Sequence, residues 1–383
     1  LPDLCVLPAK PFTVAFDPDD PDVIWGGCYG GVINRMVTSR DTRRNVNLYP
    51  ENQNRAPGEL RHRFQWVAPI VMDPLDPGTV YHASQYVNRT RDGGMTWETI
   101  SPDLTTNTPE HQEFPGVPIH SDHTGVEVFN TIFALAPSPH ERGTLWVGSD
   151  DGLVHITRDD GATWTDITPE DMPRYGTVNR IEVSPHAPGR AFLAVQRYRM
   201  DDWRPYVFRT DDFGRSWELL TDGENGIPAD HWVRVIREDD QQPGLLYAGT
   251  EFGVFVSFDD GGGWQRLQMN LPATPVTDMK VHRGDLVLST QGRSFWVLDD
   301  LTPLRELAAD LQGGRTGSLG SSGLGAESAA SPALLFTPRD VARGRASPPM
   351  SEVNLTLPDP LPEGALLSYA LTKWVLTPLT RMA

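Results

Sequence analysis

Four copies of one short pattern, Ser/Thr-x-Asp-x-Gly-x-x-Trp, occur in the chain of 383 residues. They occupy residues 90–97, 157–164, 210–217 and 257–264, so successive copies begin 67, 53 and 47 residues apart. That spacing is typical of one four-stranded propeller blade with loops of variable length. The repeat therefore predicts an all-β fold, a β-propeller of four-stranded blades. The 35 Gly and 34 Pro residues agree, because they predict many turns and argue against long helices.

A second periodic feature, a Pro, Asp or Gly turn followed by an alternating apolar strand, lies about 20 residues before the copies. Together the two features predict a unit of four strands, with the Asp pattern on the hairpin between the third and the fourth. In the fifth unit these strands are 232–236, 245–249, 254–257 and 264–267. Six units are recognised near 11–50, 64–104, 127–169, 178–221, 231–270 and 276–304, and the terminal segments would add a seventh if they complete a blade.

Composition divides the chain into three parts. Residues 1–307 form the predicted propeller, in which the first and sixth units lack the Asp pattern. Residues 308–332 are rich in Gly, Ser and Ala, which is typical of a flexible linker or insert. Residues 333–383 are expected to add an edge strand to the sixth sheet and then to begin a truncated β segment.

Each Asp pattern has a structural interpretation. Its Asp is an acceptor for the amides of the hairpin turn, its Gly takes a positive φ, and its Trp packs on the neighbouring sheet. A catalytic group is needed once, whereas a turn clamp is needed in every blade, so repetition favours the structural role over catalysis or calcium binding. The residues assigned to it are Asp92, Trp97, Asp159, Trp164, Asp212, Trp217, Asp259 and Trp264.

The net charge and the absence of known motifs exclude several classes of function. The net charge of -18 excludes a general binder of the nucleic-acid backbone, which needs a basic face. No apolar run reaches the ~20 residues of a membrane-spanning helix, and two cysteines leave the redox compartment open. Four histidines show no metal-ligand spacing: His120, His123, His155 and His231. No phosphate loop, dinucleotide motif or serine-nucleophile elbow is present, so neither a metal nor a cofactor is expected.

The four patterns resemble the Asp-box, or bacterial-neuraminidase repeat, of sialidases, tandem-propeller xyloglucanases and the sortilin ectodomain. The strings at 146–155 and 292–304 are similar to those of large exported bacterial proteins labelled glycosyl hydrolase or sortilin N-terminal-domain proteins. This resemblance runs from about 11 to 345 and implies the second propeller of a longer exported protein, hence an extracytoplasmic or secreted location. The Arg-Ile-Pro signature of sialidases is absent, because Glu182 follows Arg180 and Ile181. A sialidase is therefore disfavoured.

The four strands of a blade are lettered A to D in chain order. Ligands of propellers usually bind at the mouth of the central channel, where the D–A loops between blades and the B–C turns within a blade emerge. These loops include Gln65 and residues 197–203. The carboxylates expected there are Asp150, Asp151, Glu127, Glu251 and Asp278. The expected ligand-binding residues are Arg180, Arg234, Arg293, Trp232, Trp66 and His231. Such a mixture suits sugars, because aromatic rings stack on them while carboxylates and guanidinium groups bind their hydroxyls.

Two functions of different classes follow. The first is a non-catalytic propeller that binds a glycan, a peptide or a partner domain, for example a second propeller of the parent chain. The second is a glycoside hydrolase resembling the tandem xyloglucanases. Its site would lie on this propeller, with two of these carboxylates as catalytic residues, or in the cleft to a first propeller, with one carboxylate from each. The competing interpretation of these arginines and carboxylates is that they form ion pairs between blades and bind no ligand. Under either function, Asp150, Asp151, Glu251, Arg180, Arg234 and Arg293 are predicted to converge on one mouth of the ring.

Overall fold

The computed structural model describes residues 13–51, 55–114, 128–313, 333–337 and 369–371. Within them the fold is a β-propeller of six antiparallel blades, as the repeat predicts. The predicted completion of a seventh blade by the terminal segments concerns residues that lie mostly outside the described ranges. The chain divides into two compact units: residues 1–223 with 228–236, and residues 224–227 with 237–383.

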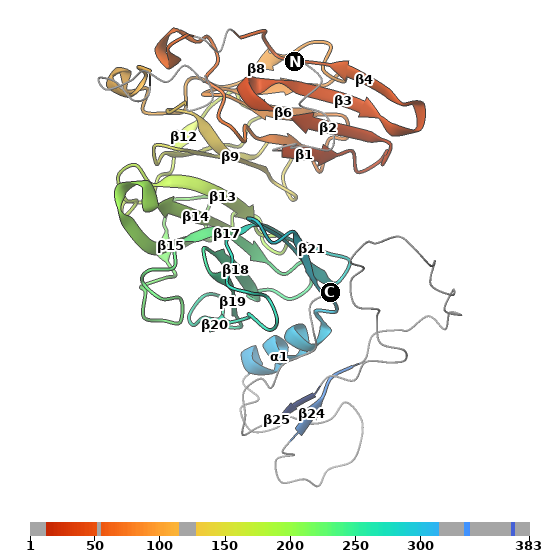
Figure 1. Ribbon diagram of the computed structural model, residues 1–383, viewed down its shortest axis with the longest axis vertical. Helices are drawn as coiled ribbons and strands as arrows, with labels where there is room; N and C mark the ends of the chain where they lie inside the picture. Colours follow the sequence, from red (N-terminus) through yellow and green to blue (C-terminus); the bar gives the residue numbers. More distant parts are fainter. Residues whose placement is uncertain (1–12, 52–54, 115–127, 314–332, 338–368, 372–383) are drawn as a thin grey trace. The chain divides into compact units, whose positions relative to one another are not determined.

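The first unit contains four blades, each a sheet in which successive strands are neighbours (Figure 1). Blade 1 consists of β1 (Thr13–Phe16), β2 (Val23–Gly27), β3 (Ile33–Val37) and β4 (Thr42–Asn45). Blade 2 consists of β5 (Ile70–Met72), β6 (Val80–Ala83), β7 (Val87–Thr90) and β8 (Glu98–Thr99). Blade 3 consists of β9 (Ile132–Pro137), β10 (Leu145–Ser149), β11 (Val154–Thr157) and β12 (Thr165–Asp166). Blade 4 consists of β13 (Thr177–Val183), β14 (Ala191–Arg197), β15 (Asp202–Thr210) and β16 (Glu218–Leu219).

Blade 5 consists of β17 (Val233–Glu238), β18 (Leu246–Thr250), β19 (Gly253–Ser257) and β20 (Gln265–Arg266). The boundary between the two units falls within β17. Blade 6 has three strands: β21 (Val276–His282), β22 (Asp285–Thr290) and β23 (Phe295–Leu298). The helix α1 (Thr302–Gln312) follows it. The remaining strands are β24 (Ala333–Leu335) and β25 (Tyr369–Leu371).

Two expectations about the C-terminal region are wrong. The predicted linker begins at 308, yet α1 continues through Gln312, because Leu304 and Ala308 lie one turn apart and are both buried. Alanine is a good helix former as well as a common linker residue, so composition alone misplaced this boundary. The strand β24 was expected to extend the sixth sheet, but it pairs with β25. The rest of the predicted linker and tail, 314–332, 338–368 and 372–383, lies outside the described residues.

The core of the first unit lies between successive blades. One cluster joins blades 1 and 2, another joins blades 2 and 3, and the largest joins blades 3 and 4 around Trp146, Leu193 and Phe208. Blades 2 and 3 each contribute apolar side chains to two of these clusters, so each of them packs against both of its neighbours. Gly148 in β10 shows how close this contact is, because a Cβ there would lie 2.3 Å from a methyl carbon of Val178 in β13.

The Asp patterns close the hairpins of blades 2 to 4. In blade 2, Asp92 Oδ1 accepts the amides of Met95 (2.8 Å) and Thr96 (2.9 Å), and its Oδ2 accepts the Thr96 hydroxyl (2.7 Å). Asp159 binds Thr163, and Asp212 binds Ser216, through the same amide and hydroxyl positions. These amide hydrogen bonds hold the pKa of Asp92 at about 2.

The Trp of each pattern fastens its blade to the one before it. Trp97 Nε1 donates to the carbonyl of Val46, Trp164 Nε1 to that of Ile100, and Trp217 Nε1 to that of Ile167, at 2.7–2.9 Å. The accepting residue follows the outermost strand of the preceding blade. In the second unit, Asp259 Oδ1 accepts the amide of Gly263 at 2.9 Å, and Trp264 is buried.

A second set of turn clamps was not anticipated. In the turn between β5 and β6, the buried Asp73 accepts the amides of Leu75 (2.8 Å) and Asp76 (3.0 Å) and the Tyr81 hydroxyl (2.9 Å). Asp239 in blade 5 makes the equivalent three contacts. The sequence placed turns there, but it did not identify the side chain that closes them.

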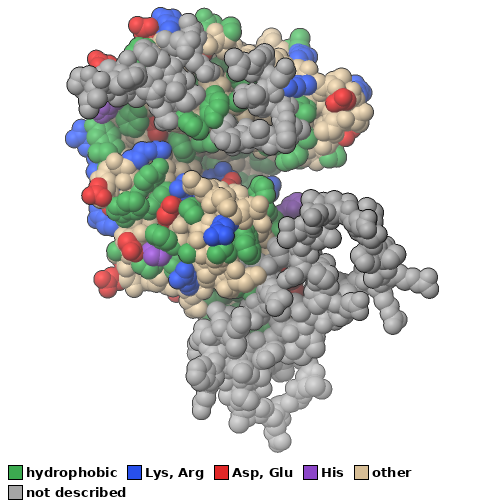
Figure 2. Space-filling view, viewed as in Figure 1, with side chains coloured by type: hydrophobic (Ala, Val, Ile, Leu, Met, Phe, Trp, Pro, Cys, Tyr) green, Lys and Arg blue, Asp and Glu red, His purple; other side chains and the backbone are tan. Residues whose placement is uncertain are grey.

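The described surface mixes charges of both signs, and Figure 2 shows acidic and basic side chains beside one another. Ion pairing also reaches below the surface: Arg89 of β7 is 6% exposed and pairs with Glu98 at 2.8 Å and with Asp160 at 2.5 Å. Cys28 is disulfide-bonded, and Cys5, the other cysteine of the sequence, lies outside the described residues. Among the described residues, no helix is both long enough and apolar enough to cross a membrane.

Candidate functional site

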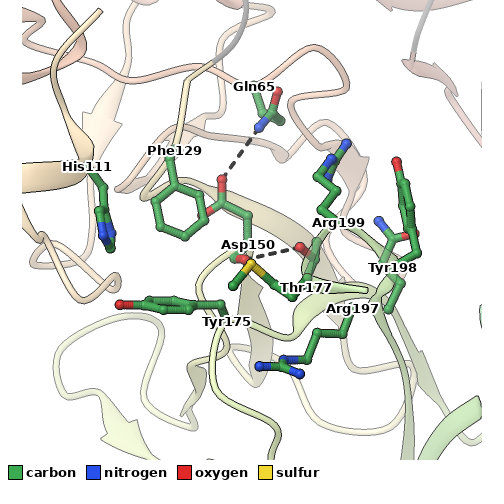
Figure 3. A pocket seen from close by; sticks show the side chains of 11 residues that line it. Gln65, His111, Phe129, Asp150, Tyr175, Thr177, Arg197, Tyr198 and Arg199 are labelled. Atoms are coloured by element: carbon green, nitrogen blue, oxygen red, sulfur yellow. Dashed lines mark hydrogen bonds between the residues drawn. The ribbon is translucent and has the colours of Figure 1, made fainter. Parts of the chain in front are cut away.

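A cavity of about 310 Å³ opens among the loops of blades 2, 3 and 4 in the first unit (Figure 3). Its walls come from the D–A connections and the B–C turns, the loops expected to carry a ligand site. The lining residues are Gln65, His111, Phe129, Asp150, Tyr175, Thr177, Gln196, Arg197, Tyr198, Arg199 and Met200.

Asp150 is the one carboxylate among the described residues that line this cavity. It follows β10 and is 3% exposed. Its Oδ1 accepts the Thr131 amide (2.9 Å), and its Oδ2 accepts the Thr131 hydroxyl (2.7 Å) and Gln65 Nε2 (3.4 Å). Burial raises the pKa of Asp150 to about 7, and the neighbouring charge of Asp151 adds to the rise, although the hydrogen bonds from Thr131 oppose it.

Asp151 belongs to a buried polar network instead of the cavity wall. Its Oδ2 accepts the amide and hydroxyl of Thr106 (both 2.8 Å) and Asn130 Nδ2 (2.6 Å), and its Oδ1 accepts the Ser149 hydroxyl. Asn130 continues the network, since its carbonyl accepts Arg63 Nε at 3.0 Å. Because these contacts occupy both carboxylate oxygens, Asp151 acts as a structural link between the loops of blades 2 and 3.

Three aromatic side chains form one side of the cavity. His111, Phe129 and Tyr175 meet edge to face, with ring centroids 5.4–6.2 Å apart. His111 and Phe129 come from the connection between β8 and β9, and Tyr175 from the one between β12 and β13; Figure 3 shows them grouped on the side opposite Tyr198 and Arg199. Sequence reasoning missed all three, because nothing in their local sequence marks them as neighbours.

The opposite side is the loop between β14 and β15, which contains the 3₁₀ turn η6 (Tyr198–Met200). Tyr198 stacks on Trp232 with centroids 4.5 Å apart and an interplanar angle of 18°. The guanidinium carbon of Arg234 lies 4.2 Å from the Trp232 ring. Trp232 is only 1% exposed. Tyr198 and Arg234 thus pack against a buried indole, and the assignment of Trp232 as a ligand-binding residue stays a prediction.

Gln196, near the end of β14, supplies an unsatisfied acceptor. The side chain is 4% exposed, and its Oε1 has no hydrogen-bond partner within the described residues. An unpaired polar atom that is buried costs about 1–3 kcal/mol. Gln196 lines the cavity, so a ligand whose hydroxyl or amide donor reaches Oε1 would remove that cost.

The remaining predicted residues of the first unit lie outside the cavity wall. Arg180 is half-buried in β13, and Asn179 beside it donates to the Arg234 carbonyl at 2.5 Å. His231 bonds to Asp230 at 2.7 Å, and Trp66 packs edge-on against Tyr29 with centroids 5.0 Å apart. The structure thus brings Asp150 and the 197–200 loop together, with Arg234 and Trp232 behind them.

Three predicted residues belong to the second unit. Asp278 in β21 pairs with Arg237 at 2.8 Å, which is the ion pairing between blades that competes with a catalytic role. Glu251 lies half-buried in the turn between β18 and β19, and Arg293 is exposed between β22 and β23. Glu127 lies outside the described residues. That all six residues named in the sequence analysis converge on one mouth of the ring stays a prediction.

No metal site emerges from the part of the chain that the structure describes. It holds no group of three or more His, Cys, Asp or Glu side chains placed to bind a metal ion.

The fold and this loop-lined cavity define the class of the protein as a β-propeller. The chain is similar to the GH74 xyloglucanase from Xanthomonas campestris, with 16% identity and a TM-score of 0.53 over 77% of this chain and 46% of that enzyme. It therefore spans less than half of the enzyme's length. It is also similar to YCF48 bound to a D1 peptide (13% identity, TM-score 0.49, 75% of this chain and 78% of that one).

An ancestral GH74 enzyme is a further similar structure, with 18% identity and a TM-score of 0.46 over 64% of this chain and 30% of that one. No protein-family model matches the chain, and no curated protein sequence matches it. At these identities the similarity shows the propeller fold alone.

Proposed function

We propose that this propeller is a non-catalytic binding module that holds part of a glycan in the cavity of blades 2 to 4. The observation that carries the proposal is the pairing of an aromatic wall with an unsatisfied buried acceptor, Gln196 Oε1. Sugar rings present C–H faces that pack on aromatic rings and hydroxyls that donate hydrogen bonds. The volume of about 310 Å³ is at the lower end of the ~300–1,000 Å³ usual for ligand pockets.

The arrangement of carboxylates favours binding over hydrolysis. A glycosidase needs two carboxyl groups, ~5–5.5 Å apart for retention or ~6.5–9.5 Å apart for inversion of configuration. Asp150 alone lines the cavity among the described residues, and hydrogen bonds occupy both oxygens of Asp151. This part of the chain therefore supplies one candidate acid without a partner.

The second candidate function is glycoside hydrolysis. One observation favours it: burial raises the pKa of Asp150 to about 7, the range of a general acid. The similarity to part of a xyloglucanase is compatible with this function, with the second carboxylate supplied from outside the described residues.

A glycan array followed by calorimetry tests the proposal, with hydrolysis of each bound glycan assayed in parallel. We expect Tyr175→Ala and Gln196→Ala each to weaken binding of the array hits about tenfold, the equivalent of 1.4 kcal/mol. Tyr49→Ala is the matched control, because Tyr49 is 38% exposed and does not line the cavity. Binding that the two cavity variants leave unchanged, or binding of peptides but no glycan, would contradict the proposal. Cleavage that Asp150→Asn abolishes would establish the hydrolase instead.

A further inference from the structure

Arg199 stands apart from the other arginines around the cavity. It lies in η6, lines the cavity and is exposed. Its guanidinium carbon lies 5.1 Å from the centre of the Tyr198 ring. Tyr198 is in turn stacked on the buried Trp232. A guanidinium held against an aromatic ring keeps the N–H donors at its edge available, in a planar fork that matches a carboxylate.

The neighbouring arginines are already occupied. Arg197 donates to the Arg174 carbonyl (2.7 Å) and to Asp202 (3.1 Å). Arg204 binds both oxygens of Asp202 at 2.8 and 2.9 Å. Arg199 forms neither a hydrogen bond nor an ion pair within the described residues, and its ring contact with Tyr198 supplies no acceptor. In a protein with a net charge of -18, such a cation beside a cavity calls for an acceptor from outside.

We infer that the cavity selects an acidic sugar, a glycan unit whose ring bears a carboxylate that Arg199 binds while Gln196 accepts one of its hydroxyl hydrogens. This inference rests on the proposed glycan binding and adds the class of sugar. Two independent features support it, namely the unpaired guanidinium at the rim and the unpaired buried acceptor at the wall. A neutral sugar would satisfy only the second.

Asp150 makes such binding depend on pH. The neighbouring charge of Asp151 raises the pKa of Asp150. The other titratable or charged side chains of the cavity wall are His111, Tyr175, Arg197, Tyr198 and Arg199. An ionised Asp150 opposes a second carboxylate in the cavity, whereas the protonated form does not. Because its pKa is about 7, we expect an acidic sugar to bind more tightly at pH 6 than at pH 8.

The test compares sugars that differ only in charge. Trimers of galacturonate, glucuronate and mannuronate are each titrated calorimetrically against their methyl esters, together with the neutral glycans of the array. We expect at least one uronate trimer to bind tenfold or more tightly than its ester. Arg199→Ala should abolish that preference, and Arg199→Lys should retain part of it. Arg215→Ala should keep all of it, because Arg215 is exposed on an Asp-pattern hairpin and does not line the cavity.

The outcomes separate the two proposals. An ester that binds as well as its acid would contradict the inference about Arg199 but leave the proposed glycan binding intact. Binding of only neutral or sulfated glycans would have the same meaning. If no glycan of either kind binds, both fall. If a uronate preference survives in Arg199→Ala, the acidic sugar is bound elsewhere and the assignment to Arg199 is overturned. A uronate preference that weakens from pH 6 to pH 8 in the wild type, but not in Asp150→Asn, would support the role of Asp150.

Discussion

Replacing Gly161 with alanine tests how the Asp patterns join one blade to the next. Gly161 has a φ of +91°, which disfavours any side chain, and its amide donates to the Thr157 hydroxyl at 3.0 Å. An added Cβ would lie 2.6 Å from the Ile100 carbonyl oxygen of the preceding blade. The same oxygen accepts Trp164 Nε1 at 2.9 Å. The new methyl group would therefore press on the junction between blades 2 and 3.

Gly78 provides a matched control for the backbone part of this effect. Its φ is +89°, and an added Cβ would meet nothing within 4 Å. A non-glycine residue in this left-handed region costs roughly 1–3 kcal/mol, and both variants bear that cost. Overpacking a tightly packed site adds about 1–3 kcal/mol, and only Gly161→Ala bears it. We expect Gly161→Ala to destabilise the protein by about 1–3 kcal/mol more than Gly78→Ala.

Urea unfolding of the full chain, followed by far-ultraviolet circular dichroism, measures the difference. The free energy of unfolding falls linearly with urea at about 1–3 kcal/mol per molar for small proteins, so the midpoint should drop visibly further for Gly161→Ala at an unchanged slope. Equal midpoints for the two variants would refute the reasoning, because they would mean that blade 3 does not rest on the Ile100 carbonyl.

Three further predictions concern single side chains. Trp164→Phe removes the donor to the Ile100 carbonyl and should lower the free energy of unfolding by about 1–2 kcal/mol in the same urea assay; an unchanged value would exclude that hydrogen bond as a fastener. Asp92→Ala should lower the melting temperature at pH 7 but much less at pH 2, because the Thr96 amide holds the pKa of Asp92 at about 2 and its stabilisation disappears as pH falls through that value. A loss independent of pH would count against the clamp. For Asp150, burial raises the pKa to about 7, so the folded state keeps a proton that the unfolded chain releases, and wild-type stability should fall by up to about 4 kcal/mol as pH rises from about 4 to 7. Asp150→Asn should make stability nearly independent of pH over this range. A variant with the same pH dependence as the wild type would show that another group titrates there.

The repeating architecture can be predicted from the amino-acid sequence alone. The Asp pattern works through contacts within five or six residues, as Asp92 shows by binding Met95 and Thr96. Short-range contacts of this kind require particular residues at fixed spacing. The pattern recurs because each of these hairpins needs an acceptor for the amides of its turn. The four strands of the fifth unit were therefore predicted within one or two residues of their observed bounds. Prediction failed where one composition suits two structures, as in the Ala-rich residues 308–312 of α1.

Which loop side chains meet at the cavity depends on how the blades pack, and the sequence did not predict it. His111, Phe129 and Tyr175 approach one another from segments up to 64 positions apart, and no local pattern marks them. Asp150 and Asp151 are adjacent and look equivalent in the sequence, yet one lines the cavity and the other joins the network around Asn130. Burial, pairing and pKa depend on distances between separate blades, and spacing along the chain does not encode those distances.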